Sequence, residues 1–259
     1  MAVLLTVFWG LLGTAVGSFL NVVADRLPAG GSLLYPPSRC EACGRRLAAL
    51  ELLPVLSYLA LGGHCRTCGA TVRVRVLAVE AGTGLLFALA AWRLAPDSLI
   101  QWATFLLVSA YLAVLVIAAV TDLEHGLILD RVTFPAIGLA LVGAALAGWP
   151  EALYRLGGGL LGAAVIVLVI VLLPHGMGWG DAKLAGFVGL ATGLPGVLFA
   201  LFVAFVSGGV VAGALLATRR RRPGDAIPLG PFLALGGGMT LLYGKEMLHA
   251  FYALATLMR

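Results

Sequence analysis

The chain has 259 residues, of which 61% are hydrophobic and 11% charged, and its mean hydropathy is +1.04. This composition excludes an ordinary soluble globular protein, and it indicates an all-α polytopic membrane protein. The net charge of +5 is explained by membrane topology and by attraction to anionic lipid headgroups, so it requires no nucleic-acid partner.

About 20 mostly apolar residues are needed to cross a bilayer. The first such stretch lacks a basic start and is followed by Asp25 and Arg26, which indicates a permanent helix rather than a cleaved signal peptide. The sixth and seventh are separated only by the turn signal Gly193-Leu194-Pro195-Gly196. Eight spans are predicted, over residues 2–24, 76–94, 98–121, 131–149, 155–174, 181–195, 196–217 and 229–251.

The basic residues predict the orientation, because cytoplasmic segments of membrane proteins are enriched in Lys and Arg. If the N-terminus is outside, the outside segments contain only Arg93, Arg155, Lys245 and Arg259. The inside segments hold the other thirteen of the seventeen basic residues, namely Arg26, Arg39, Arg45, Arg46, Arg66, Arg73, Arg75, Arg131, Lys183, Arg219, Arg220, Arg221 and Arg222. We therefore expect a multi-pass protein of the cytoplasmic membrane with its N-terminus outside.

Residues 25–75 resemble a small soluble domain and contain all four cysteines. Two knuckles, Cys40-x2-Cys43-Gly and Cys65-x2-Cys68-Gly, supply four thiolates for tetrahedral zinc. The alternative is two disulfides or four unrelated buried thiols, but disulfides rarely persist in the reducing cytoplasm. Four cysteine ligands leave no position for water, so we expect a structural ion that stabilises a segment too short for a large core.

These features predict three regions: a first transmembrane helix over 1–24, a cytoplasmic cysteine-rich zinc-binding domain over 25–75, and a helical transmembrane domain over 76–259. Glu80 lies about one turn inside the second span. It either faces the interior or a partner, or is a charge at a helix N-terminus, and its position does not separate the two. Solvated surface is predicted for the loop acids Glu41, Glu51, Asp97, Glu151, Asp225 and Glu246.

The stretch TDLEHGLILD, residues 121–130, ends the third predicted span on the inside face. Asp122 follows a continuous apolar run and could project into the helix bundle, although a polar turn that ends a helix is the alternative. Glu124 and His125 fit such a turn. Asp130 precedes the fourth predicted helix and is expected to be its N-cap.

The stretch GMGWGDAKLAG, residues 176–186, places Asp181 at the start of the sixth span on the same face. Gly176, Gly178 and Gly180 permit positive φ and close approach of another backbone, such as an extended peptide. A glycine-rich turn with an N-capping aspartate is the alternative. Lys183 is either an inside-facing anchor or a group that tunes the neighbouring carboxylate.

Two carboxylates at one membrane depth can act together on one water molecule. Like charges at short range disfavour double ionisation, so one carboxylate stays protonated and the other acts as a base. This is the chemistry of aspartic proteases, in which water attacks a peptide carbonyl without a covalent intermediate. Asp122 and Asp181 are therefore the candidate catalytic pair.

The order of motifs resembles that of the bacterial type 4 prepilin peptidases, bifunctional leader peptidases and N-methyltransferases of the GxGD aspartyl protease group. The motifs are SFLNVVADRLP (18–28), the paired cysteine knuckles with LPVLSYLALGGHC (53–65), RVRVLAVEAGTG (73–84), TDLEHGLILD, GMGWGDAKLAG and IPLGPFLALGG (227–237). The resemblance covers nearly the whole chain. One departure is Leu129, which stands where the family is expected to have proline.

The resemblance implies that Asp122 and Asp181 are catalytic within a transmembrane peptidase domain. It implies cleavage of the short basic leader of prepilins and pseudopilins at the cytoplasmic face, then methylation of the new N-terminus from S-adenosylmethionine. No nucleotide-binding fingerprint locates the methyl-donor site. Asn21, Glu80, Gly178, Gly180 and Lys183 are candidates for substrate or cofactor contacts.

Two alternatives are considered, of which only the second belongs to a different class of protein. Another GxGD intramembrane protease without methyltransferase activity, or an archaeal preflagellin peptidase, would not be expected to carry the paired knuckles. An ion-coupled transporter would explain acidic residues in the membrane. A transporter built from inverted repeats should show matching halves, and the GxGD and cysteine segments each occur once.

Overall fold

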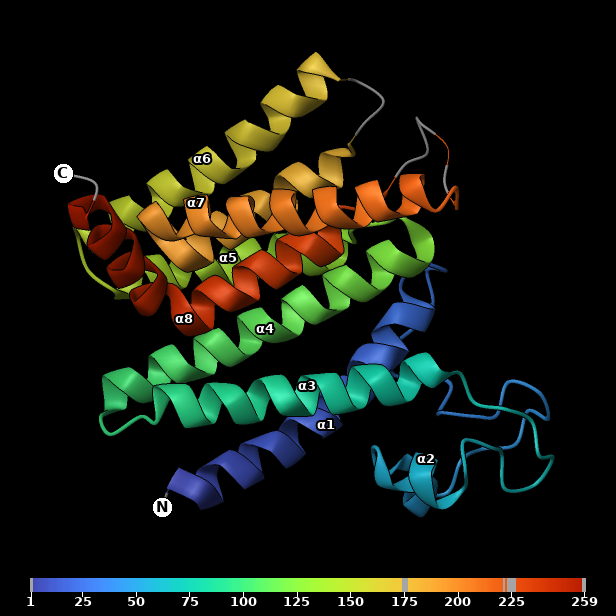
Figure 1. Cartoon of the computed structure of the whole chain (residues 1–259). Coiled ribbons are helices and arrows are strands. Elements are labelled where there is room, and N and C mark those ends of the chain that lie inside the picture. The colour runs from blue at the N-terminus through green and yellow to red at the C-terminus, as the bar shows by residue number, and fades with distance from the viewer. Residues whose placement is uncertain (1, 174–176, 221, 223–226, 258–259) are drawn as a thin grey trace. The chain divides into compact units, whose positions relative to one another are not determined.

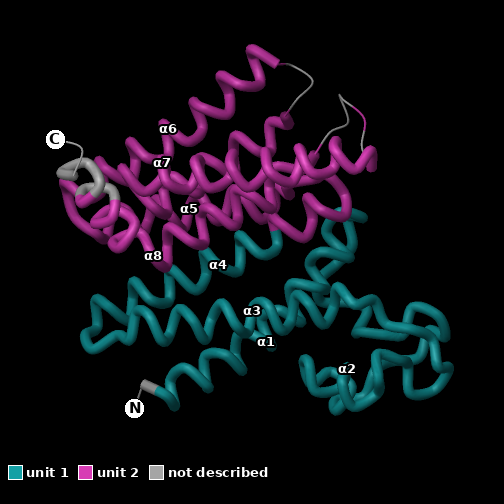
Figure 2. Tube along the Cα trace, viewed as in Figure 1, with its two compact units in different colours: residues 1–117 teal, residues 118–259 magenta. Residues whose placement is uncertain are grey.

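The computed structural model describes residues 2–173, 177–220, 222 and 227–257. Over these ranges the regular elements of the chain are helices (Figure 1). Two isolated β-bridges also occur there, one between Arg39 and Arg46 and one between His64 and Thr71. This confirms the predicted all-α class. The chain forms two compact units, Met1–Ile117 and Ala118–Arg259 (Figure 2), and their boundary lies inside the long helix α4 (Leu99–His125).

Unit 1 is built on the close packing of α1 (Ala2–Arg26) against α3 (Val74–Leu94). A Cβ at Gly13 would lie 2.7 Å from the Cβ of Phe87, and one at Gly17 would lie 2.8 Å from the Cα of Glu80. Only glycine allows the helices to approach this closely, as in small-xxx-small packing of membrane helices. The cysteine-rich segment joins the two helices and contains η1 (Ala49–Leu52) and α2 (Leu56–Ala60).

Trp9 connects α1 to the first part of α4 within unit 1. Its indole Nε1 donates a hydrogen bond to Ser109 Oγ at 3.0 Å. Its ring packs 4.7 Å from the ring of Phe105 and 6.4 Å from that of Phe87, measured between centroids. A buried indole needs such a partner for its N–H, so this contact stabilises the three-helix packing.

Unit 2 contains the end of α4, then α5 (Asp130–Leu146), α6 (Glu151–Leu172), α7 (Trp179–Ala217) and α8 (Gly230–Leu257). Glycines again allow close helix packing. A Cβ at Gly158 of α6 would lie 2.5 Å from the carbonyl oxygen of Gly189 in α7, and one at Gly236 of α8 would collide with the carbonyl oxygen of Ala200 in α7. The backbone of α7 therefore touches two neighbouring helices.

The helix α7 is two helices joined by a reversal at Gly193 and Leu194, which have non-helical backbone angles. Ala185 and Val197 both lie within 3.1 Å of the position of a Cβ at Gly162. In a straight helix twelve residues span about 18 Å, so the chain must fold back between them. Gly193 has φ of 65°, which glycine adopts without strain. The predicted turn between the sixth and seventh spans is therefore present.

The described residues include five helices that are long and apolar enough to cross a bilayer: Val3–Arg26, Val74–Leu94, Leu99–His125, Glu151–Leu172 and Trp179–Ala217. Large apolar side chains such as Leu4, Leu160 and Val210 are exposed on them, as expected for faces in contact with lipid. A multi-pass membrane protein is confirmed, whereas the count of eight spans stays a prediction.

Candidate functional site

Asp122 lies in the last turn of α4 and is only 6% exposed. Its Oδ2 accepts a hydrogen bond of 2.7 Å from the backbone N–H of Gly230, the first residue of α8. A Cβ at residue 230 would lie 2.6 Å from that same oxygen. A larger residue would therefore force the Asp122 side chain or the start of α8 to shift, and the positive end of the α8 dipole faces the carboxylate.

Asp181 is the third residue of α7 and is 8% exposed. Its Oδ2 accepts a hydrogen bond of 3.0 Å from the backbone N–H of Gly178, the N-cap residue. Thus Asp181 reaches back to the N-cap amide, as the acidic residue does in a capping box.

The two glycines beside Asp181 differ in their surroundings. A Cβ at Gly180 would lie 2.9 Å from the Cβ of Ile128, whereas one at Gly178 would meet nothing closer than 3.7 Å. Neither glycine uses the positive φ that glycine permits, since Gly178 has φ of −94° and Gly180 is not among the glycines with positive φ. Gly176 lies outside the described residues.

Asp122 and Asp181 both belong to unit 2. Among the described residues, each carboxylate accepts a hydrogen bond through Oδ2 alone. The close approach of Gly180 to Ile128 packs the start of α7 onto the segment that follows Asp122. The two predicted motifs are thus brought together, although they are separated by 59 positions in sequence (181 minus 122).

Lys183 contacts a different acid. Its Nζ lies 2.6 Å from Oδ1 of Asp130 and 5.2 Å from the centroid of the Phe134 ring. The expected capping role of Asp130 is wrong, because the N-cap of α5 is Leu129 and Asp130 makes no cap hydrogen bond. Its carboxylate instead binds Lys183, which attaches the start of α7 to the start of α5.

The four cysteines form one cluster, with all sulfurs within 4.8 Å of one another. Sγ of Cys40 lies 3.7 Å from Sγ of Cys68, close to the separation of about 3.8 Å expected for two thiolates on tetrahedral zinc. Disulfide bonding needs about 2.05 Å, and all four cysteines are free. The donor set and its spacing therefore fit zinc.

The two knuckles have the same backbone form. The Cys40 carbonyl accepts from Gly44 and the Cys65 carbonyl from Gly69, each at 3.0 Å, and both glycines have φ of 69°. Backbone N–H groups of Cys43 and Ala42 lower the pKa of Cys40, and those of Cys68 and Thr67 lower the pKa of Cys65. These amides therefore favour the thiolate at Cys40 and Cys65, and the thiolate is the form that binds metal.

Glu51 supports this cluster and is not the solvated residue that was predicted. Its side chain is 7% exposed and accepts two hydrogen bonds from Arg45, at 2.6 and 3.0 Å, and one from the N–H of Ala48 at 2.8 Å. Glu51 first, and then the Cys65 thiol, raise the pKa of the Arg45 guanidinium above its usual range. A bidentate arginine placed in this way orients and balances a charged ligand set.

Asn21 and Glu80 are both buried, at 5% exposure each. Asn21 Nδ2 donates to the carbonyl of Val76 at 3.1 Å, and Glu80 Oε2 accepts from the N–H of Val55 at 2.7 Å. Val55 has φ of 63°, an unusual conformation for a β-branched residue. Of the two interpretations of Glu80, the interior one with a partner is therefore confirmed, and its partner is the cysteine-rich segment.

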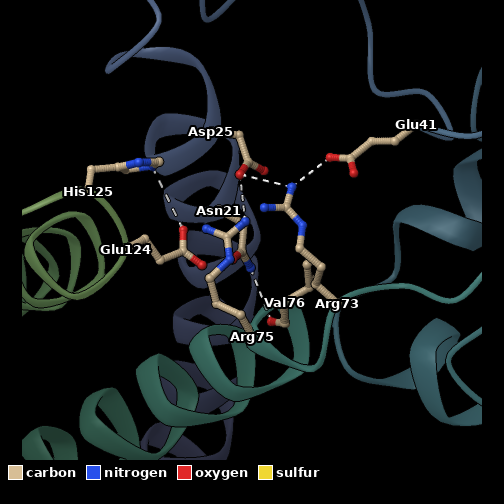
Figure 3. Close-up of polar contacts among 8 residues, drawn as sticks. All are labelled: Asn21, Asp25, Glu41, Arg73, Arg75, Val76, Glu124 and His125. Atoms are coloured by element: carbon tan, nitrogen blue, oxygen red, sulfur yellow. Dashed lines mark hydrogen bonds and ion pairs between the residues drawn. The ribbon is translucent and has the colours of Figure 1, made fainter. Parts of the chain in front are cut away.

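An ion-pair network lies beside Asn21 (Figure 3). Asp25 Oδ1 binds Arg75 at 2.6 Å and Arg73 at 3.1 Å, and Arg73 also binds Glu41 at 2.6 Å. These contacts join the end of α1 to the start of α3. The same region of unit 1 forms a partly open cavity of about 790 Å³, which Asn21 and Glu80 both line.

Two family models match the chain: the bacterial peptidase A24 N-terminal domain over residues 11–94 and the type IV leader peptidase family over residues 109–213. The prepilin leader peptidase/N-methyltransferase of Pseudomonas putida is 33% identical over 264 residues, which cover 92% of this chain and 90% of that protein. The chain belongs to the type IV leader peptidase family. Proteins of the same name from Pseudomonas aeruginosa and Bacillus subtilis are each 31% identical, covering 95% of this chain and 92% and 97% of theirs. No solved structure matches.

Within this leader peptidase framework, sequence reasoning did not identify the contacts that hold the motif residues. Gly230 was part of a recognised motif, but its role as donor to Asp122 depends on a contact across 108 positions. In the sequence, Arg45 and Glu51 are only a basic and an acidic residue in the same loop, and nothing there indicates that they pair. The approach of Val55 to Glu80 likewise depends on how the cysteine-rich segment folds.

Proposed function

We propose that this protein is a membrane aspartyl endopeptidase that removes the basic leader from type 4 prepilins and pseudopilins and then methylates the new N-terminus. One observation carries the peptidase activity. Two buried aspartates, Asp122 and Asp181, lie at helix ends in one unit, and each has one oxygen held by a backbone N–H. The relatives named prepilin leader peptidase/N-methyltransferase support both activities.

In the proposed reaction, the two carboxylates share one proton and hold one water molecule between them. The ionised carboxylate takes a proton from water while the water oxygen bonds to the peptide carbonyl carbon. The protonated carboxylate donates to the carbonyl oxygen. The carbon–nitrogen bond then breaks, and the leaving nitrogen accepts the proton that the first carboxylate took from water. The N–H groups of Gly178 and Gly230 keep each carboxylate oriented and leave Oδ1 of each for the water.

The proposed location follows from charge. With the N-terminus outside, most basic residues and both aspartates fall on the cytoplasmic side of the inner membrane. Prepilin leaders are basic, so they would remain on that face. The proposed regions are the first helix over 1–24, the cysteine-rich domain over 25–75 and the peptidase domain over 76–259, with zinc bound by Cys40, Cys43, Cys65 and Cys68 and S-adenosylmethionine as methyl donor.

The test uses Asp122→Asn and Asp181→Asn, which keep side-chain shape but cannot act as the base. We expect each to lower prepilin cleavage in membranes at least about a hundredfold. Asp130→Asn is the matched control, because it lies in the same sequence block but forms a surface ion pair of small energy. Near wild-type cleavage by either active-site variant, at normal protein level, would refute the dyad.

A further inference from the structure

The cavity of unit 1 is lined by residues between Ser18 and Glu80, so neither Asp122 nor Asp181 is among its lining residues. It lies between the end of α1, the start of α3 and the cysteine-rich segment, and its volume is about 790 Å³. This is within the usual range for small-molecule sites. Cys40 and Cys65 are among its lining residues, so the segment that the metal would order also forms a wall of the cavity.

Two hydrogen-bond acceptors at the cavity are only partly used. Asn21 donates through Nδ2, but its Oδ1 is buried and has no hydrogen-bond partner among the described residues. Glu80 accepts from Val55 through Oε2. A Cβ at Gly17 of α1 would lie 2.8 Å from the Cα of Glu80, and Asn21 is one helical turn further along α1, so the two acceptors come from facing helices. A buried acceptor is unfavourable unless a donor reaches it, which predicts a ligand with N–H or O–H groups.

The cations at the cavity divide into two kinds. Arg26 donates to the carbonyl of Ser32, and Arg73 is paired with Asp25 and Glu41. Arg39 lines the cavity and makes no ion pair or side-chain hydrogen bond with any described residue. A guanidinium group binds a carboxylate in bidentate fashion. Arg39 together with Glu80 and Asn21 therefore matches a carboxylate and an ammonium group, the two charged groups of a free amino acid.

Two aromatic residues are among those that line the cavity. Tyr58 and Tyr35 both line it. The Tyr58 ring is held against Gly63, where a Cβ would lie 2.9 Å from its Cζ and hydroxyl atoms, and its hydroxyl donates to the Val72 carbonyl at 3.4 Å. Such rings stack on planar heterocycles such as a nucleobase.

We propose that this cavity binds S-adenosylmethionine, with Arg39 on its carboxylate, Glu80 and Asn21 on its ammonium and hydroxyl groups, and Tyr58 against the adenine. This inference rests on the proposed methyltransferase activity and assigns it a site. In the transfer, the neutral amine of the new N-terminus bonds to the methyl carbon. The carbon–sulfur bond breaks with its electron pair remaining on sulfur, and the amine releases one proton to water.

The test measures the Kd of labelled S-adenosylmethionine for the full-length, zinc-loaded protein in nanodiscs. We expect Arg39→Gln and Asn21→Leu each to raise the Kd about tenfold or more, because each removes a polar partner. Arg46→Gln is the matched control: Arg46 forms the β-bridge with Arg39 but does not line the cavity, so its Kd is expected to stay within twofold of wild type. Zinc content and melting temperature of each variant report on folding.

Hydrogen exchange on the wild-type protein gives an independent measurement if a variant fails to fold. S-adenosylmethionine is expected to slow exchange in residues 32–42 and 51–58 and to leave residues 181–201 unchanged. Unchanged Kd in both variants, or protection outside the cavity only, would overturn the site while methylation continues. A rise in the KM for prepilin cleavage with unchanged donor Kd would assign the cavity to the peptide instead and also overturn it. If wild-type protein neither binds the donor nor methylates, the methyltransferase proposal itself fails.

Discussion

Gly230→Ala tests how the carboxylate of Asp122, which is proposed to be catalytic, is held. The added Cβ would lie 2.6 Å from Oδ2 of Asp122 and 3.0 Å from its Cβ and Cγ, so the side chain or the start of α8 must move. We expect this movement to break the 2.7 Å hydrogen bond from the Gly230 N–H. A hydrogen bond to a charged group contributes about 1.5–3 kcal/mol, and roughly 1.4 kcal/mol corresponds to tenfold in rate.

We therefore expect kcat for prepilin cleavage to fall roughly 10- to 150-fold, with KM changed little because the substrate contacts remain. The assay is cleavage of purified prepilin by protein in nanodiscs under saturating substrate. Gly138→Ala in α5 is the matched control, since a Cβ there meets nothing within 4 Å, and it should retain wild-type kcat. A folded Gly230→Ala protein with kcat within twofold of wild type would refute this role for the α8 amide.

Two further predictions concern the cysteine-rich segment. Protein purified under reducing, chelator-free conditions is expected to hold about one zinc ion per chain, and Cys65→Ser to lose it; a metal content near zero in the wild type would contradict the site. Arg45, followed by the Ala48 N–H, lowers the pKa of Glu51 from 4.5 to about 2. Because the pKa is depressed in the folded state, this carboxylate stabilises the segment fully above pH 4.5, and the stabilisation is lost as pH falls toward 2. Hydrogen exchange in residues 45–52 should therefore accelerate over that range in the wild type, whereas Glu51→Gln should show no such pH dependence.

Features that depend on neighbours in the chain were predictable from sequence. The apolar stretches predicted the helices, including the reversal at Gly193, because a span of fixed length and a turn residue are local properties. The cysteine spacing predicted a cluster in the same way, since each knuckle forms within six residues. The motif aspartates were also identifiable, as carboxylates are expensive in a membrane unless they have a function.

The partners of these residues were decided by tertiary structure. Asp130 looked like an N-cap by position, but its carboxylate meets Lys183 when α7 packs beside α5. Glu51 looked solvated, but Arg45 covers it.

Tertiary structure also decided two hydrogen bonds from backbone N–H groups to buried carboxylates, namely Gly230 to Asp122 and Val55 to Glu80. The amide N–H groups that hold these carboxylates are present at nearly every residue, so no residue type marks them in sequence. Only the packing of one helix end against another determines which amide reaches which carboxylate.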